Sequence, residues 1–142
     1  MMRALALDIG SKTIGVAMTD EARIAAHPLT VLARVGHSGD AAAVAAVVAE
    51  HGVSDVVVGM PFELSGKRGH RARRVDEFVA VLRRALPAGI ALHEQDERFS
   101  TAEAERALIA ADVPRAQRRG VIDRHAAAVI LQAWLDAQRL RG

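Results

Sequence analysis

The stretch Leu5–Asp20, LALDIGSKTIGVAMTD, reads as two β-strands joined by a tight turn. Apolar residues fill Leu5–Leu7 and Ile14–Met18, and the Gly-Ser-Lys segment between them has the residue types of a hairpin turn. Asp8 interrupts the first apolar run, and a buried carboxylate without a partner costs several kcal/mol. A chain that keeps a carboxylate here either pairs it, for example with the turn backbone, or uses it to hold a cation.

The rest of the chain extends this hairpin into an alternating α/β pattern. Strands are predicted over 28–34, 54–61 and 89–94, and helices over 38–52, 73–87, 100–114 and 120–140. Ser38 is placed to cap the first helix, Gly52 to end it, and Ser100 with Glu103 to form a capping box. The order β-β-β-α-β-α-β-α-α predicts a mixed sheet covered by helices. A length of 142 residues predicts one domain over 1–142.

Composition excludes several classes of site. The absence of cysteine excludes disulfides and thiolate ligands, and the six histidines form no HxH or HxxxH pair that would suit zinc. No GxSxG nucleophile motif is present. The first apolar run is too short for a signal peptide, and no tract approaches the roughly 20 residues of a membrane span. We therefore expect a cytoplasmic protein without a membrane partner.

Arginines gather in two segments of a chain that holds 17 Arg and 2 Lys. The planar arginine fork suits phosphate groups, so both segments are candidates for binding a nucleic-acid backbone. The first lies within GKRGHRARR, and the second follows Pro114. Their basic residues are Lys67, Arg68, Arg71, Arg73 and Arg74, and Arg115, Arg118 and Arg119.

Further carboxylates fall where a site could form. Asp123 continues a helical stripe through Ala127, Ile130 and Trp134, which favours a core-facing position over an exposed first-turn acid. HEQDER places acids beyond the fifth predicted strand, and spacing alone does not choose among them: Glu94, Asp96 and Glu97. Three converging acids would repel one another without cations, and hard oxygen ligands suit Mg²⁺ or Mn²⁺.

Four blocks, DIGSKTIGVAMTD, VVVGMPFELSGKRG, DERFSTAEAE and VIDRHAAAVILQAWLD, resemble the YqgF/RuvX family. This family comprises Holliday-junction-resolvase-like proteins that are also described as nucleases for precursor 16S rRNA. The resemblance implies an α/β, ribonuclease H-like fold with a five-stranded mixed sheet flanked by helices. It places the catalytic and metal-binding carboxylates at Asp8, Glu97 and Asp123. Other matching motif positions are Lys12, Gly59, Pro61, Gly66 and Arg98, and of these we expect Lys12 and Arg98 to bind nucleic acid. Thr13 departs from the arginine of many members.

The activity implied by the resemblance is metal-dependent phosphodiester hydrolysis, with two divalent ions that activate water and stabilise the leaving oxygen. Precursor rRNA is the favoured substrate. A junction resolvase acting on DNA, which requires a two-fold dimer, and a non-catalytic nucleic-acid-binding module remain alternatives. Monomer and homodimer both stay open. The chain is too short for a two-domain sugar-kinase or actin-type ATPase, and its four Phe and Trp residues are too few for an extensive base-stacking platform.

Overall fold

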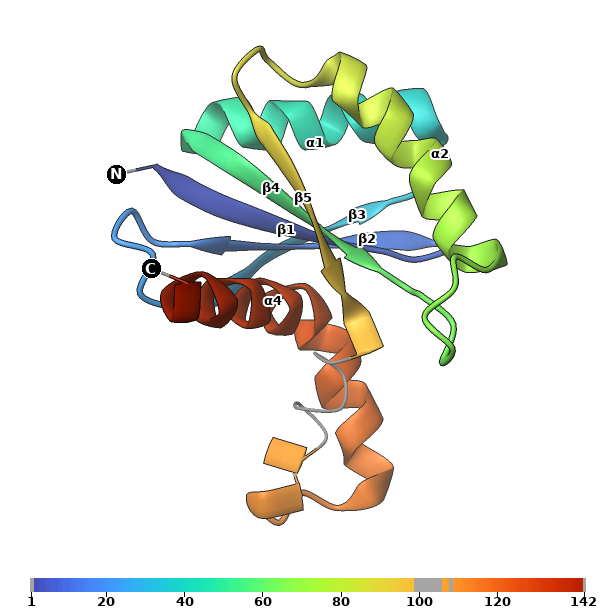
Figure 1. The fold of residues 1–142 in the computed structure, drawn as a ribbon, viewed down its shortest axis with the longest axis vertical. Coiled ribbons are helices and arrows are strands. Elements are labelled where there is room, and N and C mark those ends of the chain that lie inside the picture. The colour runs from blue at the N-terminus through green and yellow to red at the C-terminus, as the bar shows by residue number, and fades with distance from the viewer. Residues whose placement is uncertain (1, 99–105, 108, 142) are drawn as a thin grey trace.

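The computed structural model describes residues 2–98, 106–107 and 109–141, except for the side chains of 119–124. Its centre is a five-stranded sheet of order β3-β2-β1-β4-β5 (Figure 1). The strands are β1 (Arg3–Ile9), β2 (Thr13–Thr19), β3 (Ala26–Ala33), β4 (Val53–Met60) and β5 (Ala91–Asp96). The first three strands pair antiparallel, whereas β4 pairs parallel with both β1 and β5. The predicted five-stranded mixed sheet is confirmed.

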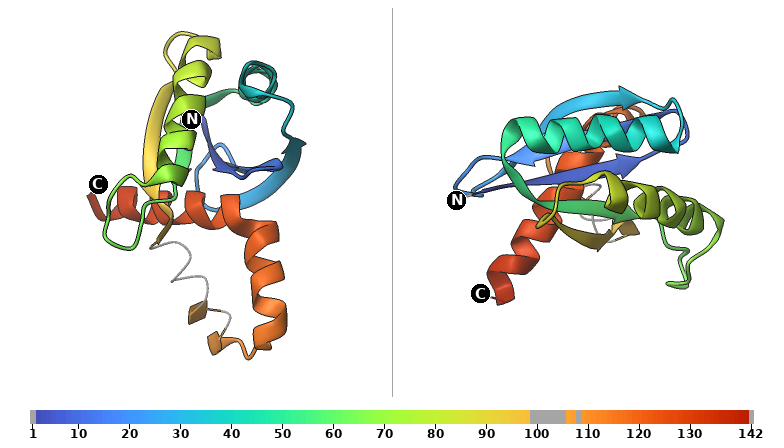
Figure 2. Two further views of the ribbon diagram at one scale, coloured as in Figure 1. Left: turned by 90° about the vertical axis from the view of Figure 1, so that its right-hand side faces the viewer. Right: turned by 90° about the horizontal axis from the view of Figure 1, so that it is seen from above.

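Helices cover both faces of this sheet. α1 (His37–His51) and α2 (His70–Ala85) lie on one face, and the carboxyl-terminal half of α4 (Arg115–Arg141) crosses the other (Figure 1). The first half of α4 turns away and projects beyond the sheet (Figure 2). Among the helices in the described part of the chain, none is both long and apolar enough to cross a membrane.

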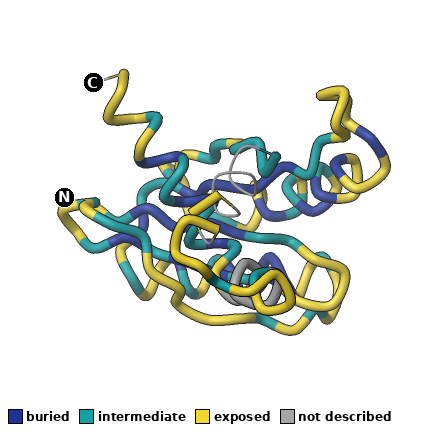
Figure 3. Tube along the Cα trace, turned by 90° about the horizontal axis from the view of Figure 1, so that it is seen from below, coloured by how far each residue is buried: buried dark blue, intermediate teal, exposed yellow. Residues whose placement is uncertain are grey.

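Two apolar clusters fix which way each strand residue points. Leu5 and Leu7 of β1 belong to the cluster under α1 and α2, while Ala4 and Ala6 belong to the cluster under α4. Because side chains alternate along a strand, Asp8 follows Ala4 and Ala6 onto the α4 side. Figure 3 shows the buried positions along the strands and exposed positions on the connecting loops.

The stripe predicted on the last helix is borne out for the described side chains. Ala127, Ile130 and Trp134 are buried against the sheet, and small residues let α4 approach β1 and β2 closely. Asp123 lies one turn earlier in the same helix, and its side chain is outside the described part of the structure.

Several predicted boundaries were wrong. α1 begins at His37 after Gly36, and Ser38 makes no capping hydrogen bond; Gly52 does end this helix, in the left-handed conformation. α2 begins at His70 instead of Arg73, and α4 at Arg115 instead of Gly120. β5 runs to Asp96 because its parallel pairing with β4 continues to the Met60–Asp96 pair. The predicted Ser100–Glu103 capping box lies outside the described residues.

Candidate active site

Asp8 and Glu97 meet at the carboxyl ends of three neighbouring parallel strands. Asp8 is the penultimate residue of β1, and Glu97 directly follows β5. β4 lies between these strands, with Leu7 paired to Val58 and Gly59 paired to Gln95. The carboxyl ends of parallel strands are where open α/β sheets place their sites. Glu97 reaches across β4, and its carboxyl group hydrogen-bonds that of Asp8.

Gly59 makes room for this pair on the α4 side of the sheet, whereas Gly15 is not required to be a glycine for that reason. A Cβ at Gly59 would lie 2.7 Å from Oε1 of Glu97 and 2.5 Å from Cδ1 of Ile130. A Cβ at Gly15, opposite Asp8 in the β1–β2 ladder, would meet Asp8 and Ala127 at an ordinary 3.7 Å. The Glu97 side chain therefore uses space that only a glycine at position 59 leaves open.

The electrostatics of the pair are those of two acids that compete for one proton. Burial, and then the neighbouring Asp8 carboxylate, raise the pKa of Glu97 to about 7. The positive charge of Arg71 opposes this rise only in part. Two carboxyl groups held in contact form a site that favours binding a cation.

Asp96 pairs with Arg98, whereas Glu97 contacts Asp8. Its carboxylate accepts hydrogen bonds from the backbone and side chain of Arg98, at 3.0 Å for both Nε and the backbone nitrogen. The bonds from Arg98, opposed by burial, hold the pKa of Asp96 below its usual range. Arg98 also donates to the carbonyl oxygens of Glu63 and Leu64 at 3.3 and 3.0 Å. Asp96 and Arg98 thus join the end of β5 to the β4–α2 loop.

The donor chemistry of Asp8 and Glu97 fits a hard divalent cation such as Mg²⁺ or Mn²⁺. Among the side chains that the structure describes, no group of three or more His, Cys, Asp or Glu residues is placed to hold a metal ion. The two contacting carboxylates therefore form part of a possible ligand set, and the third predicted carboxylate, Asp123, is outside the described side chains.

The predicted nucleic-acid-binding residues occupy different surroundings. Arg68 bonds Asp76 at 2.8 Å and Glu94 at 2.7 Å, and its guanidinium lies 5.2 Å from the ring centre of Phe62. Glu94 is thereby held away from the Asp8–Glu97 pair. Arg118 donates to the carbonyl oxygen of Val113. Exposed positions are Lys12 on the β1–β2 turn, Lys67 in the β4–α2 loop, Arg71, Arg73 and Arg74 on α2, and Arg115 on α4; the side chain of Arg119 is outside the described part.

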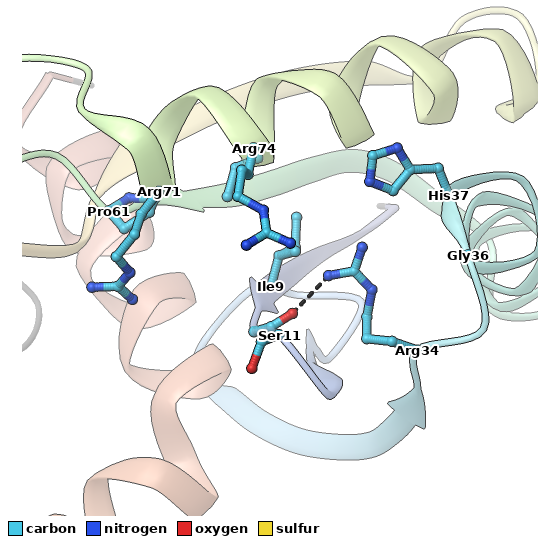
Figure 4. A pocket seen from close by; sticks show the side chains of 10 residues that line it. Ile9, Ser11, Arg34, Gly36, His37, Pro61, Arg71 and Arg74 are labelled. Atoms are coloured by element: carbon cyan, nitrogen blue, oxygen red, sulfur yellow. Dashed lines mark hydrogen bonds between the residues drawn. The ribbon is translucent and has the colours of Figure 1, made fainter.

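Sequence reasoning missed Arg34 and Asp40. Asp40 is only 2% exposed, and it accepts hydrogen bonds from Nε of Arg34 at 2.7 Å and from the backbone nitrogen of Val35 at 2.9 Å. This pair fixes Arg34 beside Arg74, which lies on the same cavity (Figure 4). An Arg and an Asp six residues apart across a strand–helix junction form no periodic pattern, so only the fold reveals the pair.

Comparison with known sequences finds relatives over nearly the whole chain. The family described as "RuvX: Holliday junction resolvase" matches residues 2–137. A protein of Myxococcus xanthus (strain DK1622) named "Putative pre-16S rRNA nuclease" is 46% identical over 138 residues, covering 97% of this chain and 90% of that protein. A protein of Geobacillus kaustophilus (strain HTA426) with the same name is 46% identical over 140 residues, covering 97% and 100%.

A solved structure shares the fold. The chain described as "T. thermophilus RuvC in complex with Holliday junction substrate" superposes with a TM-score of 0.59 at 19% identity, covering 98% of this chain and 96% of that chain. This likeness, together with the sheet order, confirms the predicted α/β, ribonuclease H-like fold.

Proposed function

The chain belongs to the RuvX family, and from this premise we propose that residues 1–142 form a single nuclease domain that hydrolyses phosphodiester bonds in precursor 16S rRNA. The relatives named as pre-16S rRNA nucleases support the choice of substrate, because they are 46% identical over nearly the full chain. Hydrolysis at this site would depend on a divalent metal.

The observation that carries the proposal is the Asp8–Glu97 pair. Two carboxyl groups from distant strands share a hydrogen bond at the strand ends, and burial with mutual repulsion raises the pKa of Glu97 to about 7. Asp8 and Glu97 contact each other, and two acids held this close form an arrangement that suits a metal-binding site.

Asp8 and Glu97 would hold the metal, with Asp123 as a third ligand from α4. When bound, a divalent ion such as Mg²⁺ or Mn²⁺ would supply Lewis-acid activation of the attacking water and stabilise charge on the leaving oxygen. Glu97 would release its proton as it becomes a ligand, and Gly59 would keep its side chain aligned against β4. The exposed basic residues on α2 and the β4–α2 loop would position the phosphate backbone, which adds affinity with little sequence preference.

The test is an incubation of purified protein with labelled precursor 16S rRNA, a linear single-stranded RNA and a four-way DNA junction, each with Mg²⁺, Mn²⁺ or EDTA. We expect metal-dependent cleavage of the precursor and none by an Asp8→Asn variant whose circular dichroism spectrum matches the parent. Absence of cleavage of every substrate in both metals would reject the nuclease proposal and leave a non-catalytic binding module.

A junction resolvase is the second candidate, favoured by the description of the matching family. It predicts symmetric incision of the four-way junction by a dimer, because two strands must be cut in a two-fold arrangement. Junction cleavage by a dimeric species in gel filtration, with the precursor rRNA left intact, would select this candidate over rRNA processing.

A further inference from the structure

A cavity of about 380 Å³ opens on the opposite face of the sheet from Asp8 and Glu97. Its lining comes from the end of β1 and the turn that follows it, the segment that joins β3 to α1, and the first turns of α2 (Figure 4). Ile9 and Val75 give it an apolar part. Ile9 directly follows Asp8 in β1, and successive side chains of a strand point to opposite faces. The cavity and the carboxyl pair therefore lie on opposite faces of the sheet at the carboxyl end of β1.

The ionisable side chains that line this cavity are all basic. Arg34, Arg71, Arg74 and His37 line it, and none of the ten lining residues is acidic. Arg34 and Arg74 extend toward the same space from opposite walls (Figure 4). Asp40 compensates the charge of Arg34, whereas Arg71 and Arg74 add two positive charges to the lining that would attract an anion.

The three arginines differ in how they are held. Arg34 is fixed by Asp40 and by a hydrogen bond of 2.6 Å from its Nη1 to the carbonyl oxygen of Gly10. The Arg71 and Arg74 side chains have no hydrogen-bond or ion-pair partner among the residues that the structure describes. One arginine is therefore pre-organised, and two are available to a ligand. The Arg34–Asp40 pair stabilises the β3–α1 junction, and it also fixes Arg34 at the wall of the cavity that Arg71 and Arg74 line.

We propose that this cavity binds one phosphate group of the nucleic-acid strand, distinct from the phosphate that reaches Asp8 and Glu97. Guanidinium groups bind phosphate oxygens through charge-assisted, often paired hydrogen bonds. The cavity is larger than a phosphate, and Ile9 and Val75 can cover the apolar edge of the attached sugar. The phosphate is either an internal phosphodiester or the terminal phosphate of the strand.

A second phosphate site would fix the position of the bound nucleic-acid strand along its length. Arg71 lines the cavity while its charge also acts on Glu97, so the two sites are neighbours across the edge of the sheet. A strand that passes over the β1–β2 turn can occupy both, and the cavity then sets which phosphodiester bond reaches the carboxyl pair. The identity of the ligand as a substrate strand rests on the proposed function; the recognition of phosphate does not.

The test uses the full chain without metal, titrated with inorganic phosphate and followed by NMR at the backbone amides of Gly10, Ser11 and Gly36. We expect saturable shifts at these amides, and at least about tenfold weaker binding in Arg74→Gln, the loss typical of a charged hydrogen bond. Arg83→Gln is the matched control, since Arg83 is an exposed arginine on the same helix that does not line the cavity. The thermal midpoint verifies that both variants are folded.

A second titration compares a short RNA carrying a 5′-phosphate with the same RNA carrying a 5′-hydroxyl. If the parent protein binds the 5′-phosphorylated RNA more tightly than the 5′-hydroxyl RNA, and Arg74→Gln loses this preference, the cavity binds the terminal phosphate of a strand. If the parent binds both RNAs with equal affinity, the cavity binds an internal phosphate. Absence of shifts at the three amides, or equal affinity in Arg74→Gln and the parent, overturns the proposal. Neither titration depends on cleavage. The phosphate-site proposal and the nuclease proposal can therefore fail independently of each other.

Discussion

Gly59 allows Glu97 to lie flat against β4, where its carboxyl group reaches Asp8. A methyl group at this position would stand 2.7 Å from the Glu97 carboxyl oxygen and 2.5 Å from Ile130 of α4. Ile130 is buried against the sheet, and Glu97 contacts Asp8, so displacement of either side chain would disturb an existing contact. The glycine thus serves the site and the packing of α4 together.

Gly59→Ala should therefore lower the free energy of unfolding by about 1–3 kcal/mol, the usual cost of overpacking, and reduce cleavage. Gly15→Ala is the control, since its new methyl group meets Asp8 and Ala127 at an ordinary 3.7 Å. Urea unfolding of both variants measures the difference. Equal stability of the two variants would show that Glu97 and Ile130 shift without cost.

At the level of single residues, part of the site could be predicted from the sequence. Asp8 is conspicuous because it interrupts an apolar strand. The choice among Glu94, Asp96 and Glu97 depends on the family resemblance, because three acids in one short segment have no distinguishing pattern. The ion pairs of Asp96 with Arg98 and of Glu94 with Arg68 separate them physically. The role of Asp123 stays a prediction.

Among the elements, the junction between β3 and α1 depends on one buried carboxylate. Burial disfavours the charge of Asp40, but the backbone N–H of Val35 and the Arg34 guanidinium more than offset it and hold the pKa of Asp40 below its usual range. Because the folded pKa is depressed, this stabilisation is complete above the unfolded pKa near 3.8 and disappears as pH falls through the folded value.

Asp40→Asn should cost about 1.5–3 kcal/mol at pH 7, typical of a hydrogen bond to a charged group. The difference between parent and variant should shrink as pH falls below about 4, since the parent then loses the same charge. Urea unfolding at pH 7, 5 and 3 measures it. A difference that stays constant over this range would mean that the Asp40 charge contributes nothing.

Element boundaries were predicted less well than element types, for identifiable reasons. The apolar periodicity that marks α2 starts late because its first turn carries His70, Arg71 and Arg73, yet the backbone is already helical there. The predicted β5 is too short because parallel pairing with β4, a non-local interaction, extends the strand through polar residues to Asp96. Local sequence patterns show apolar periodicity and turn residues, but they do not show which strands pair or how far that pairing extends.

Across the whole molecule, the basic surface of α2 should determine how binding depends on salt. Arg71, Arg73 and Arg74 lie on its first turns, and the charge of Arg71 acts on Glu97. Their combined replacement by alanine should weaken binding of single-stranded RNA of any sequence. It should also flatten the slope of log K against log salt by about 0.7 for each phosphate that the variant no longer neutralises.

Fluorescence anisotropy between about 50 and 300 mM salt, the range over which such binding changes steeply, measures this slope. The control is Arg83→Ala with Arg84→Ala, which removes charge from the opposite end of the same helix. An unchanged slope in the triple variant, or an equal change in the control, would remove α2 from the binding surface. The cytoplasmic location stays a prediction, and monomer and homodimer both stay open.

The central proposal is that Asp8 and Glu97 together form a metal-dependent catalytic centre. Calorimetric titration with Mn²⁺, run beside precursor rRNA cleavage, tests this assignment in the parent and in Asp8→Asn, Glu97→Gln and Asp96→Asn. We predict that Asp8→Asn and Glu97→Gln lose metal binding and cleavage. Asp96→Asn should retain both, with a milder loss of activity through Arg98 and the β4–α2 loop. Retention of both properties by Glu97→Gln, with their loss in Asp96→Asn, would contradict the assignment.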